Sequence, residues 1–247
     1  IFLQNNNIFA VIHFAALKSI PESIKNPHVY YYNNVVSTTN LINSMKKYNC
    51  NNLIFSSSAC VYGENVIPYT ENMTIGKGIT NPYGMTKYIC EEIIKNECII
   101  NQNFNAIVLR YFNPVGNHKS GLFGDNINST NLISNIIKSI KSNKLLHIYG
   151  NKYNTKDGTC IRDFIHIDDL VYAHIVCLKK LTTFDNYKIY NIGSGTGYTV
   201  LELITQMSSF FHINYTLSKA RLGDIPIVYA DISKIKNELG WYPKRKF

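Results

Sequence analysis

Short apolar runs alternate with longer helical patterns in the first half of the chain. Three runs have the length of strands: Ala10–Ala16, Asn52–Ser56 and Ala106–Tyr111. Two longer stretches between them predict helices over about Pro27–Tyr48 and Pro82–Asn101. Continuously apolar strands are typical of a parallel sheet that helices cover on both faces. The order strand, helix, strand, helix, strand therefore predicts an α/β fold with a doubly wound parallel sheet, as in Rossmann-like proteins.

The pattern becomes less regular after Asn117, and a smaller α+β unit joins the predicted sheet in this half of the chain. The expected elements of this half, in chain order, are a helix near Asn131–Lys141, a strand over Leu145–Tyr149, a polar loop over Gly150–Gly158, the segment Arg162–Ile167 before a helix capped by Asp168 or Asp169, a strand over Lys188–Ile192 and a helix over Thr199–Ser208. Strands and helices that mix in this way complete the predicted α/β architecture.

Tyr83 and Lys87 are the first candidate catalytic pair. Pro82 is suited to the first position of a helix, so the two side chains lie four residues apart on one face. A phenol with a pKa near ~10 is a poor base at neutral pH, and a nearby ammonium is expected to lower that pKa. Alone the pair is weak evidence, because a solvated tyrosine and lysine on a helix face are common.

Ser56, Ser57 and Ser58 close the second predicted strand. Open α/β sheets bind ligands at the carboxyl ends of their strands. The alternative is that the serines merely terminate the strand. A serine at this position, followed by Tyr83 and Lys87 at the start of the next helix, forms the hydroxyl, phenol and ammonium set of short-chain dehydrogenases.

Seven segments resemble, in order, the UDP-glucose 4-epimerase family of the extended short-chain dehydrogenase/reductase superfamily. They are Ile12–Lys18, Phe55–Gly63, Asn81–Lys87, Leu109–Gly116, Asp157–Asp163, Tyr190–Tyr198 and Arg221–Asp224. Ala59 after Ser58 separates the chain from the related 4,6-dehydratases, which carry an acidic residue there. The resemblance implies interconversion of UDP-glucose and UDP-galactose, in galactose metabolism, through a 4-keto intermediate. Bound NAD would take up the hydride and return it.

The resemblance also implies roles for individual residues. Tyr83 would take the proton from the sugar 4-hydroxyl, Ser58 would hydrogen-bond the same oxygen, and Lys87 would bind the nicotinamide ribose and tune Tyr83. The other positions that match cofactor contacts are Phe14, Ala15, Ala16, Leu17, Lys18, Asn34, Ser56, Tyr111 and Phe112. Those that match contacts to the sugar nucleotide, besides Ser58 and Tyr83, are Ala59, Cys60, Asn113, Asn131, Leu132, Tyr149, Arg162, Arg221, Asp224 and Val228.

Val228 resembles the residue that lies beside the 2-substituent of the sugar in this family. A tyrosine at this position restricts the enzyme to glucose and galactose, whereas a small residue admits N-acetylated sugars. We therefore expect this chain to accept UDP-N-acetylglucosamine as well. The alternatives are that Val228 only packs within its strand, or that the matching residue is Tyr229.

The resemblance also predicts the domain organisation. Residues 1–116 and about 160–208 would bind NAD, and residues 117–159 and 209–247 would bind the sugar nucleotide. The glycine-rich dinucleotide turn and its acidic partner are expected before residue 1, and a final helix after residue 247. The chain as given is therefore expected to be inactive and to bind NAD weakly. The helices Pro27–Tyr48 and Pro82–Asn101 are expected to form a homodimer through a four-helix contact.

Composition narrows the functional classes further. The formal net charge is +9, but the basic residues are scattered, which argues against a nucleic-acid surface. No apolar run approaches the ~18 residues of a membrane helix, and the six cysteines show no metal-ligand or disulfide spacing, so we expect a cytoplasmic protein without a metal site. We interpret His13 as a core histidine and the turn Gly193–Gly197 as structural, not phosphate-binding.

Two other functions remain open at this point. One is epimerisation of another UDP-sugar, such as UDP-N-acetylglucosamine, UDP-xylose or UDP-glucuronate. The other is a sugar-nucleotide-binding protein that has lost catalysis. Ser58, Tyr83 and Lys87 are all present, which argues against the second.

Overall fold

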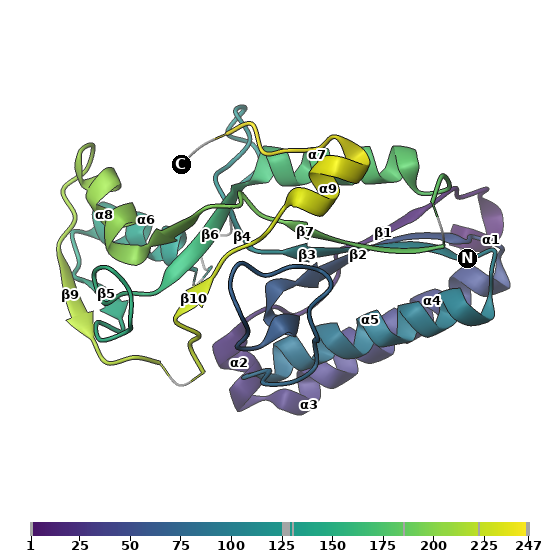
Figure 1. The fold of residues 1–247 in the computed structure, drawn as a ribbon, viewed down its shortest axis with the longest axis horizontal. Coiled ribbons are helices and arrows are strands. Elements are labelled where there is room, and N and C mark those ends of the chain that lie inside the picture. Colours follow the sequence, from purple (N-terminus) through teal and green to yellow (C-terminus); the bar gives the residue numbers. More distant parts are fainter. Residues whose placement is uncertain (1, 125–128, 130, 185, 222, 246–247) are drawn as a thin grey trace.

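A four-stranded parallel sheet lies at the centre of the protein, whose computed structural model describes residues 2–124, 129, 131–184, 186–221 and 223–245 (Figure 1). Its strands, in spatial order, are β1 (Val11–His13), β2 (Asn52–Ser58), β3 (Asn105–Tyr111) and β7 (Tyr187–Ile192). Nearly all residues of β2 and β3 are buried, as expected for strands with both faces covered. The predicted doubly wound α/β fold is confirmed.

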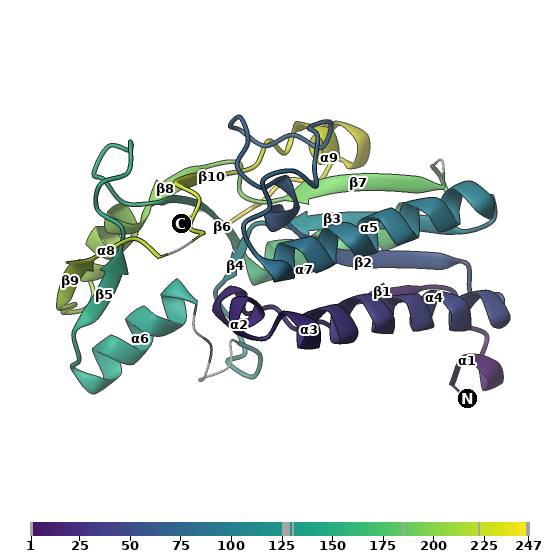
Figure 2. The same cartoon turned by 90° about the horizontal axis from the view of Figure 1, so that it is seen from below.

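Two long helical segments run side by side below this sheet (Figures 1 and 2). One is α5 (Pro82–Ile100), and the other joins α3 (Pro27–Tyr30), the π-helical segment η1 (Tyr31–Val36) and α4 (Ser37–Lys47) without a break. Met45 and Ile94 bury their side chains fully against the sheet in a shared apolar cluster. The short helices α1 (Phe2–Asn5) and α2 (Ile20–Lys25) lie near β1 in sequence, on either side of it.

Helices α7 (Ile167–Lys180) and α9 (Ser233–Leu239) lie on the opposite face of the sheet (Figure 1). Ala173 and Cys177 of α7 are fully buried in a cluster with residues of β2, β3 and β7. Trp241 follows α9 and donates its indole N–H to the carbonyl oxygen of Asp169 at 3.2 Å, which holds this end of the chain against α7.

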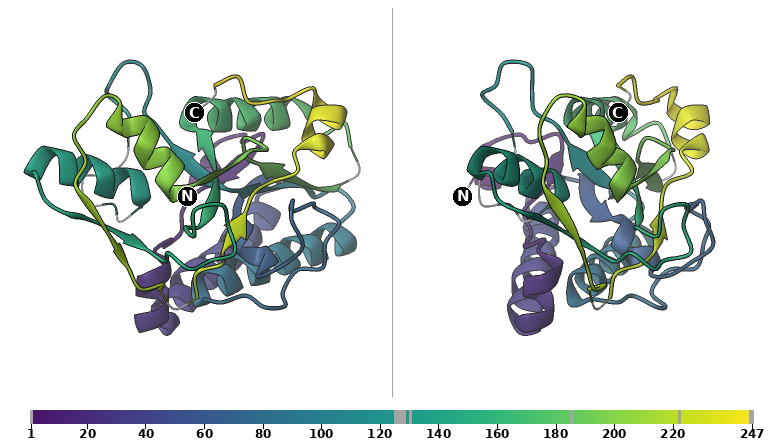
Figure 3. Two further views of the ribbon diagram at one scale, coloured as in Figure 1. Left: turned by 60° about the vertical axis from the view of Figure 1, so that its left-hand side comes forward. Right: turned by 90° about the vertical axis from the view of Figure 1, so that its left-hand side faces the viewer.

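The remaining elements gather at one end of the molecule, beyond the carboxyl ends of β2 and β3 (Figures 1 and 3). They are the 3₁₀ turn η2 (Ala59–Tyr62), the strands β4 (Asn113–Val115), β6 (Ile161–His166), β8 (Gly197–Thr199) and β10 (Ile227–Val228) of a second sheet, the parallel pair β5 (Leu146–Tyr149) and β9 (Tyr215–Ser218), and the helices α6 (Leu132–Ser142) and α8 (Val200–Ser208). Ile136, Ile148 and Leu203 form a separate apolar core here. The domain boundaries stay a prediction.

The first strand is shorter than its apolar run predicts. Only Val11–His13 pair with β2. Beyond His13 the chain leaves the sheet, and the backbone N–H and carbonyl of Leu17 bond instead to the side chain of Asn34, at 2.8 and 2.9 Å. Among the described residues, no helix is long and apolar enough to cross a membrane.

Candidate active site

Ser58 is the last residue of β2, where the sheet meets the following turn. Its backbone is extended and that of Ala59 already belongs to η2, so the strand ends in a sharp turn. The Ser58 hydroxyl oxygen accepts a hydrogen bond from the Cys60 backbone N–H at 3.2 Å. This bond orients a buried hydroxyl at the carboxyl edge of the sheet, where ligands of such folds bind.

Tyr83 and Lys87 are placed by the first turns of α5. Asn81 caps the helix by accepting a hydrogen bond from the Gly84 N–H at 2.8 Å, and Pro82 occupies the first turn. The Lys87 side chain is only 3% exposed, and its ammonium donates to the carbonyl oxygen of Ser56 at 2.6 Å. The ammonium also lies 4.8 Å from the centre of the Phe55 ring. These contacts attach the start of α5 to the end of β2.

The pKa of Tyr83 differs from the sequence prediction. Burial is the largest cause and raises the pKa of this phenol above its usual value, and the neighbouring Cys60 thiol raises it further. A hydrogen bond with Ser58 acts in the opposite direction but is the smaller effect. The predicted lowering of this pKa is therefore wrong for these side chains alone, because burial outweighs the interaction that lowers it. A positive charge on a bound ligand would favour the phenolate.

The residues at this edge fit the nicotinamide half of a dinucleotide. An ammonium has three N–H donors, and the described contacts of Lys87 give it one carbonyl acceptor, so it can bond further to ribose hydroxyls. Phe14 and Ala15, directly after β1, are exposed beside this edge, and Ala16, Leu17 and Lys18 continue the same loop. Tyr111 ends β3 directly opposite Ser58. NAD bound here would supply reversible hydride transfer.

Asn34 supports the loop after β1 from beneath. Besides its two bonds to Leu17, the amide donates to the hydroxyl of Thr86 on α5 at 3.0 Å. Asn34 lies within η1, and π-helical segments are frequent at functional sites. The amide oxygen and both amide hydrogens of Asn34 are used in hydrogen bonds within the protein. A direct contact of Asn34 with a cofactor therefore stays a prediction.

His13 is buried next to this loop and behaves as a core residue. Its Nε2 lies 3.0 Å from the Thr38 hydroxyl, which in turn donates to the carbonyl oxygen of Asn34 at 2.7 Å. Burial, followed by the charge of Lys87, lowers the pKa of His13 to about 4. The imidazole is therefore neutral at physiological pH, which agrees with its interpretation as a core histidine.

Sequence reasoning missed His174, which lies behind Tyr111. The Tyr111 phenol and Nε2 of His174 are 2.5 Å apart, and Nδ1 lies 2.8 Å from the carbonyl oxygen of Leu170. The imidazole also packs against the ring of Phe14 at 5.0 Å between centroids. His174 lies on α7, and nothing in its local sequence indicates that this helix reaches Phe14 and Tyr111.

Residues predicted to contact the sugar nucleotide fall into two groups. In the first group, Val228 of β10 pairs in register with Arg162 of β6, and Val228 packs in one apolar cluster with Phe112 and with Ala59, the residue after Ser58. Burial raises the pKa of the Cys60 thiol, while the hydrogen bond with Ser58 and the charge of Arg162 act in the opposite direction, which places the guanidinium near η2.

The second group lies where β5 and the segment before β10 meet. The Arg221 guanidinium lies 5.0 Å from the centre of the Tyr149 ring and donates to Asp224 at 3.0 Å. Tyr149 and Arg221 are exposed, so an aromatic face and a guanidinium face solvent together. Asn131 caps α6 by accepting from the Ser134 N–H at 2.8 Å, and Leu132 begins that helix.

Asn113 lies in the second sheet, directly after β3 and Phe112. It begins β4, and its side-chain amide donates to the backbone carbonyl of Asp163 on β6 at 2.9 Å. The roles predicted for Asn113 and for the other individual residues of the site stay predictions.

The glycine turn after β7 encloses a carboxylate of the protein itself. The backbone N–H groups of Ser194, Gly195 and Ala230 donate to the fully buried carboxylate of Asp163 at 2.6 to 3.1 Å. A Cβ at Gly193 would come within 2.4 Å of an Asp163 oxygen, so only glycine fits. Donors of the kind that bind phosphate in other proteins are occupied here, and the turn is structural as predicted.

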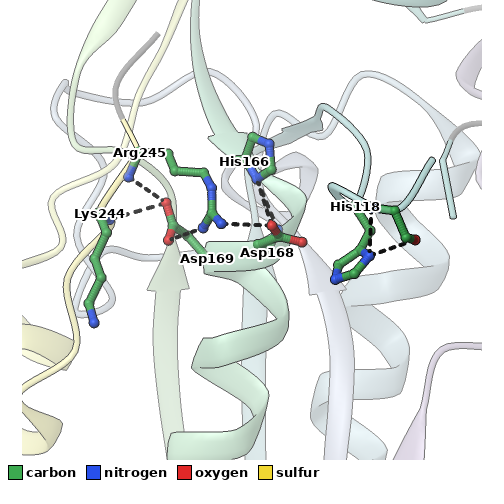
Figure 4. A network of polar contacts seen from close by, with 7 residues as sticks. His118, His166, Asp168, Asp169, Lys244 and Arg245 are labelled. Carbon is green, nitrogen blue, oxygen red and sulfur yellow. Dashed lines mark hydrogen bonds and ion pairs between the residues drawn. The ribbon is translucent and has the colours of Figure 1, made fainter. Parts of the chain in front are cut away.

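The residues His166, Asp168 and Asp169 at the start of α7 form a separate polar network (Figure 4). The helix cap is His166, which accepts from the Asp168 N–H at 3.1 Å, so the predicted aspartate cap is wrong. Asp169 instead accepts from the backbone N–H groups of Lys244 and Arg245, and Arg245 also pairs with Asp168 at 2.8 Å. Within the described part of the chain, no group of three or more His, Cys, Asp or Glu side chains could hold a metal ion.

A cavity of about 320 Å³ lies beside this network. Val115, Gly116, Ile133, Phe164, His166, Met207 and Arg245 line it. None of the predicted catalytic residues reaches it. The chemistry of Ser58, Tyr83 and Lys87, and not the size of a cavity, therefore locates the candidate site.

Comparison with known proteins then decides the family. The sequence profile of the NAD dependent epimerase/dehydratase family matches residues 1–193. The chain belongs to this family. Within the epimerase/dehydratase family, it is 43% identical over 246 residues to the UDP-glucose 4-epimerase of Haemophilus influenzae, covering 97% of this chain and 72% of that protein.

Solved structures of this epimerase/dehydratase family share the fold. The UDP-glucose 4-epimerase from Bifidobacterium longum, in complex with NAD+ and UDP, superposes with a TM-score of 0.90 at 40% identity, covering 98% of this chain and 73% of that one. The UDP-Glc/GlcNAc 4-epimerase from Campylobacter jejuni has a TM-score of 0.82 at 36% identity, covering 100% and 75%.

Proposed function

We propose that this chain carries the catalytic residues of an NAD-dependent UDP-glucose 4-epimerase, which interconverts UDP-glucose and UDP-galactose. The observation that supports this most is the position of Lys87. Its buried ammonium joins the end of β2 to the start of α5, so that Ser58 and Tyr83 share one edge of the sheet. The likeness to relatives with this activity agrees with it.

Tyr83 and Ser58 act on the sugar 4-hydroxyl in this proposal. The phenolate of Tyr83 accepts the proton as hydride leaves C4, and Ser58, which hydrogen-bonds Tyr83, orients the same oxygen. Lys87 keeps its ammonium next to the site and binds the cofactor ribose. The reaction returns the hydride to the opposite face of the 4-keto sugar, so cofactor and protein end unchanged.

Replacement of Tyr83 by phenylalanine tests the proposal. In the protein expressed from its natural gene, Tyr83→Phe should retain the fold and bound NAD and lose about 10²–10⁴-fold in turnover of UDP-galactose, because the base is removed. Tyr88→Phe, on the same helix, is the matched control and should retain turnover. Turnover of the Tyr83 variant at the wild-type rate would contradict the assignment. A wild type that binds UDP-glucose without turnover would favour the non-catalytic alternative.

Val228 supports a wider substrate range as a second proposal. Its side chain is partly buried against the apolar cluster that includes Ala59, which directly follows Ser58, and Phe112. Tyr229 alternates to the other face, where its ring lies 3.2 Å from the position of a Cβ on Gly197. This arrangement favours Val228 over Tyr229 as the residue beside the sugar. The Campylobacter jejuni relative is described as a UDP-Glc/GlcNAc epimerase.

The wild-type enzyme should then convert UDP-N-acetylglucosamine as well as UDP-glucose. Val228→Tyr should suppress the N-acetylated reaction by at least about 10-fold and spare the other, because the ring fills the space for the acetamido group. Val228→Ile adds one methylene without a ring and is the control. Competition assays with both substrates measure this. Absence of N-acetylhexosamine turnover in the wild type would rule out the second proposal and leave the first intact.

We further propose that the enzyme works in the cytosol on its small-molecule substrate, as a homodimer. All six cysteines are free thiols, five of them buried, as expected for a protein of a reducing compartment. The dimer would use the helices below the sheet, which carry exposed apolar side chains at Val29, Tyr32 and Val36.

A further inference from the structure

The hydrogen bonds of His174 have a fixed direction that bears on what Tyr111 can bind. The Leu170 carbonyl can only accept, so Nδ1 of His174, at 2.8 Å, must carry a proton. Burial lowers the pKa of His174, so the imidazole is neutral and carries one proton only. Nε2 therefore has a lone pair and accepts from the Tyr111 hydroxyl at 2.5 Å.

The Tyr111 oxygen is left as an acceptor. Its single proton points to His174, and a hydrogen bond from the Ser56 hydroxyl uses part of its accepting capacity. Tyr111 is only partly buried, pairs in register with Ser58 and lies close enough to Tyr83 for their charges to interact. An acceptor with capacity to spare is thus held at the edge of the candidate active site.

We propose that His174 fixes the Tyr111 hydroxyl as a hydrogen-bond acceptor, so that this point of the site selects a bound group with an N–H or O–H donor. This inference rests on the proposed function. Two donors suit the position: the carboxamide N–H of the oxidised cofactor and a hydroxyl of the sugar. His174 is then a positioning residue, which acts through Tyr111 without touching the ligand.

The tautomer itself is measurable before any ligand is added. In ¹⁵N-histidine NMR spectra of the protein, His174 should be a neutral imidazole with its proton on Nδ1 between pH 7 and 8. The His174→Phe spectrum assigns the resonance. A proton on Nε2, or a charged imidazole in this range, would overturn the proposal. This measurement does not require a variant to be active.

Measurements of ligand affinity then test whether Tyr111 favours a ligand group that donates a hydrogen bond. The analogue 3-acetylpyridine adenine dinucleotide replaces the carboxamide NH₂ by a methyl group. Wild-type protein expressed from its natural gene should bind NAD about 3- to 10-fold more tightly than the analogue, the usual effect of one hydrogen bond. Tyr111→Phe and His174→Phe should both abolish the preference, and the double variant should behave as either single one, since the two residues form one chain of bonds. Tyr190→Phe removes another buried hydroxyl, which bonds to Glu238, and should leave the preference unchanged.

The UDP-glucose dissociation constant, measured in the same variants, separates the two donors. A 3- to 10-fold weakening for UDP-glucose with no preference between the dinucleotides would place the donor on the sugar. If both dissociation constants stay unchanged in His174→Phe while the wild type turns over, the inference is wrong and the epimerase function stands. A wild type that neither binds NAD nor turns over would instead contradict the proposed function.

Discussion

Lys87 keeps its charge in an almost dry environment. Burial lowers the pKa of its ammonium to about 8, while Cys90 and Glu91 nearby raise it by smaller amounts. The carbonyl of Ser56 and the face of Phe55 provide partial compensation. The residue therefore lowers the stability of the fold, in agreement with a role in function and not in packing.

Lys87→Met should make the fold more stable at pH 7 while abolishing turnover. The fall of the Lys87 pKa from 10.5 to about 8 on folding corresponds to a loss of roughly 3 kcal/mol in the free energy of unfolding of the wild type. The variant avoids this loss but also loses the hydrogen bond to Ser56, worth about 1 kcal/mol, so its net gain is smaller. Because the folded pKa is lower than the unfolded one, the cost is complete below pH 8 and disappears as the pH rises toward 10.5. The gain of the variant should shrink over that window, as measured by urea denaturation. A variant less stable than the wild type at pH 7, by an amount independent of pH, would refute this.

The positions of site residues could be predicted from the sequence where a local sequence pattern indicates them. Ser58, Tyr83 and Lys87 follow from a strand end and a helical spacing, and the structure brings them to one edge. The raised pKa of Tyr83 was not predictable, because burial depends on what packs around the helix. His174 and Asp163 were missed for a related reason: their partners, Tyr111 and the glycine turn, come from distant parts of the chain.

At the scale of elements, a buried ion pair holds α5 to the sheet. Glu91, one turn after Lys87, accepts hydrogen bonds from two nitrogens of the Arg110 guanidinium, the shortest at 2.7 Å, and one from the Ser57 hydroxyl. Both charged side chains are 1% exposed. Ser57 precedes Ser58, so the ion pair fixes the helix that carries Tyr83 and Lys87 relative to the strand that carries Ser58.

Substitutions should separate the effect of the Glu91–Arg110 pair on the stability of the fold from its effect on the placement of the catalytic groups. Glu91→Leu alone should cost about 3–5 kcal/mol, because Arg110 is left buried and unpaired, and adding Arg110→Met should restore most of it. The double variant should nevertheless lose at least about 10-fold in turnover with a nearly unchanged KM for UDP-glucose, because the catalytic groups shift against each other.

Glu97→Gln is the control for that experiment. Glu97 lies on the same helix but pairs with the half-exposed Lys46, at 2.9 Å, so its loss should cost at most about 1 kcal/mol and leave turnover unchanged. A stable double variant with wild-type turnover would show that the buried pair serves stability alone.

Sequence patterns placed the elements well and their details less well. The periodicity of Pro27–Tyr48 predicts one helix, and the structure has one continuous run, but with a π-helical segment around Asn34. Within that segment, Asn34 bonds to both Leu17 and Thr86. These contacts join different elements, so the periodicity of one helix cannot predict them. The strand predicted over Ala10–Ala16 ends early for the same reason.

At the scale of the molecule, the helices below the sheet leave an apolar surface uncovered. Val29, Tyr32 and Val36 are 52%, 75% and 39% exposed, at positions about one or two turns apart along a single helical run. Exposed apolar side chains in a row are typical of a protein interface. A two-fold contact between these helices and α5 of two copies would cover them.

The protein from its natural gene should therefore sediment as a dimer at micromolar concentration. Val36→Glu should shift it toward the monomer by at least about 10-fold in dissociation constant, since a carboxylate would be buried at the contact. Val171→Glu, at an exposed position on the opposite face of the sheet, is the control and should leave the dimer intact. A wild type that sediments as a monomer would contradict the proposed assembly.

The parallel pair of β5 and β9 has a consequence for how the chain folds during synthesis. Leu146 is paired with Tyr215, about 70 residues later. At ribosomal rates of about 5–20 residues per second, β5 waits roughly 4 to 14 seconds for its partner to be made. During that interval Leu146 and Ile148, buried in the finished protein, have no strand beside them. A chaperone that binds short apolar strands would find its target in this segment of the nascent chain.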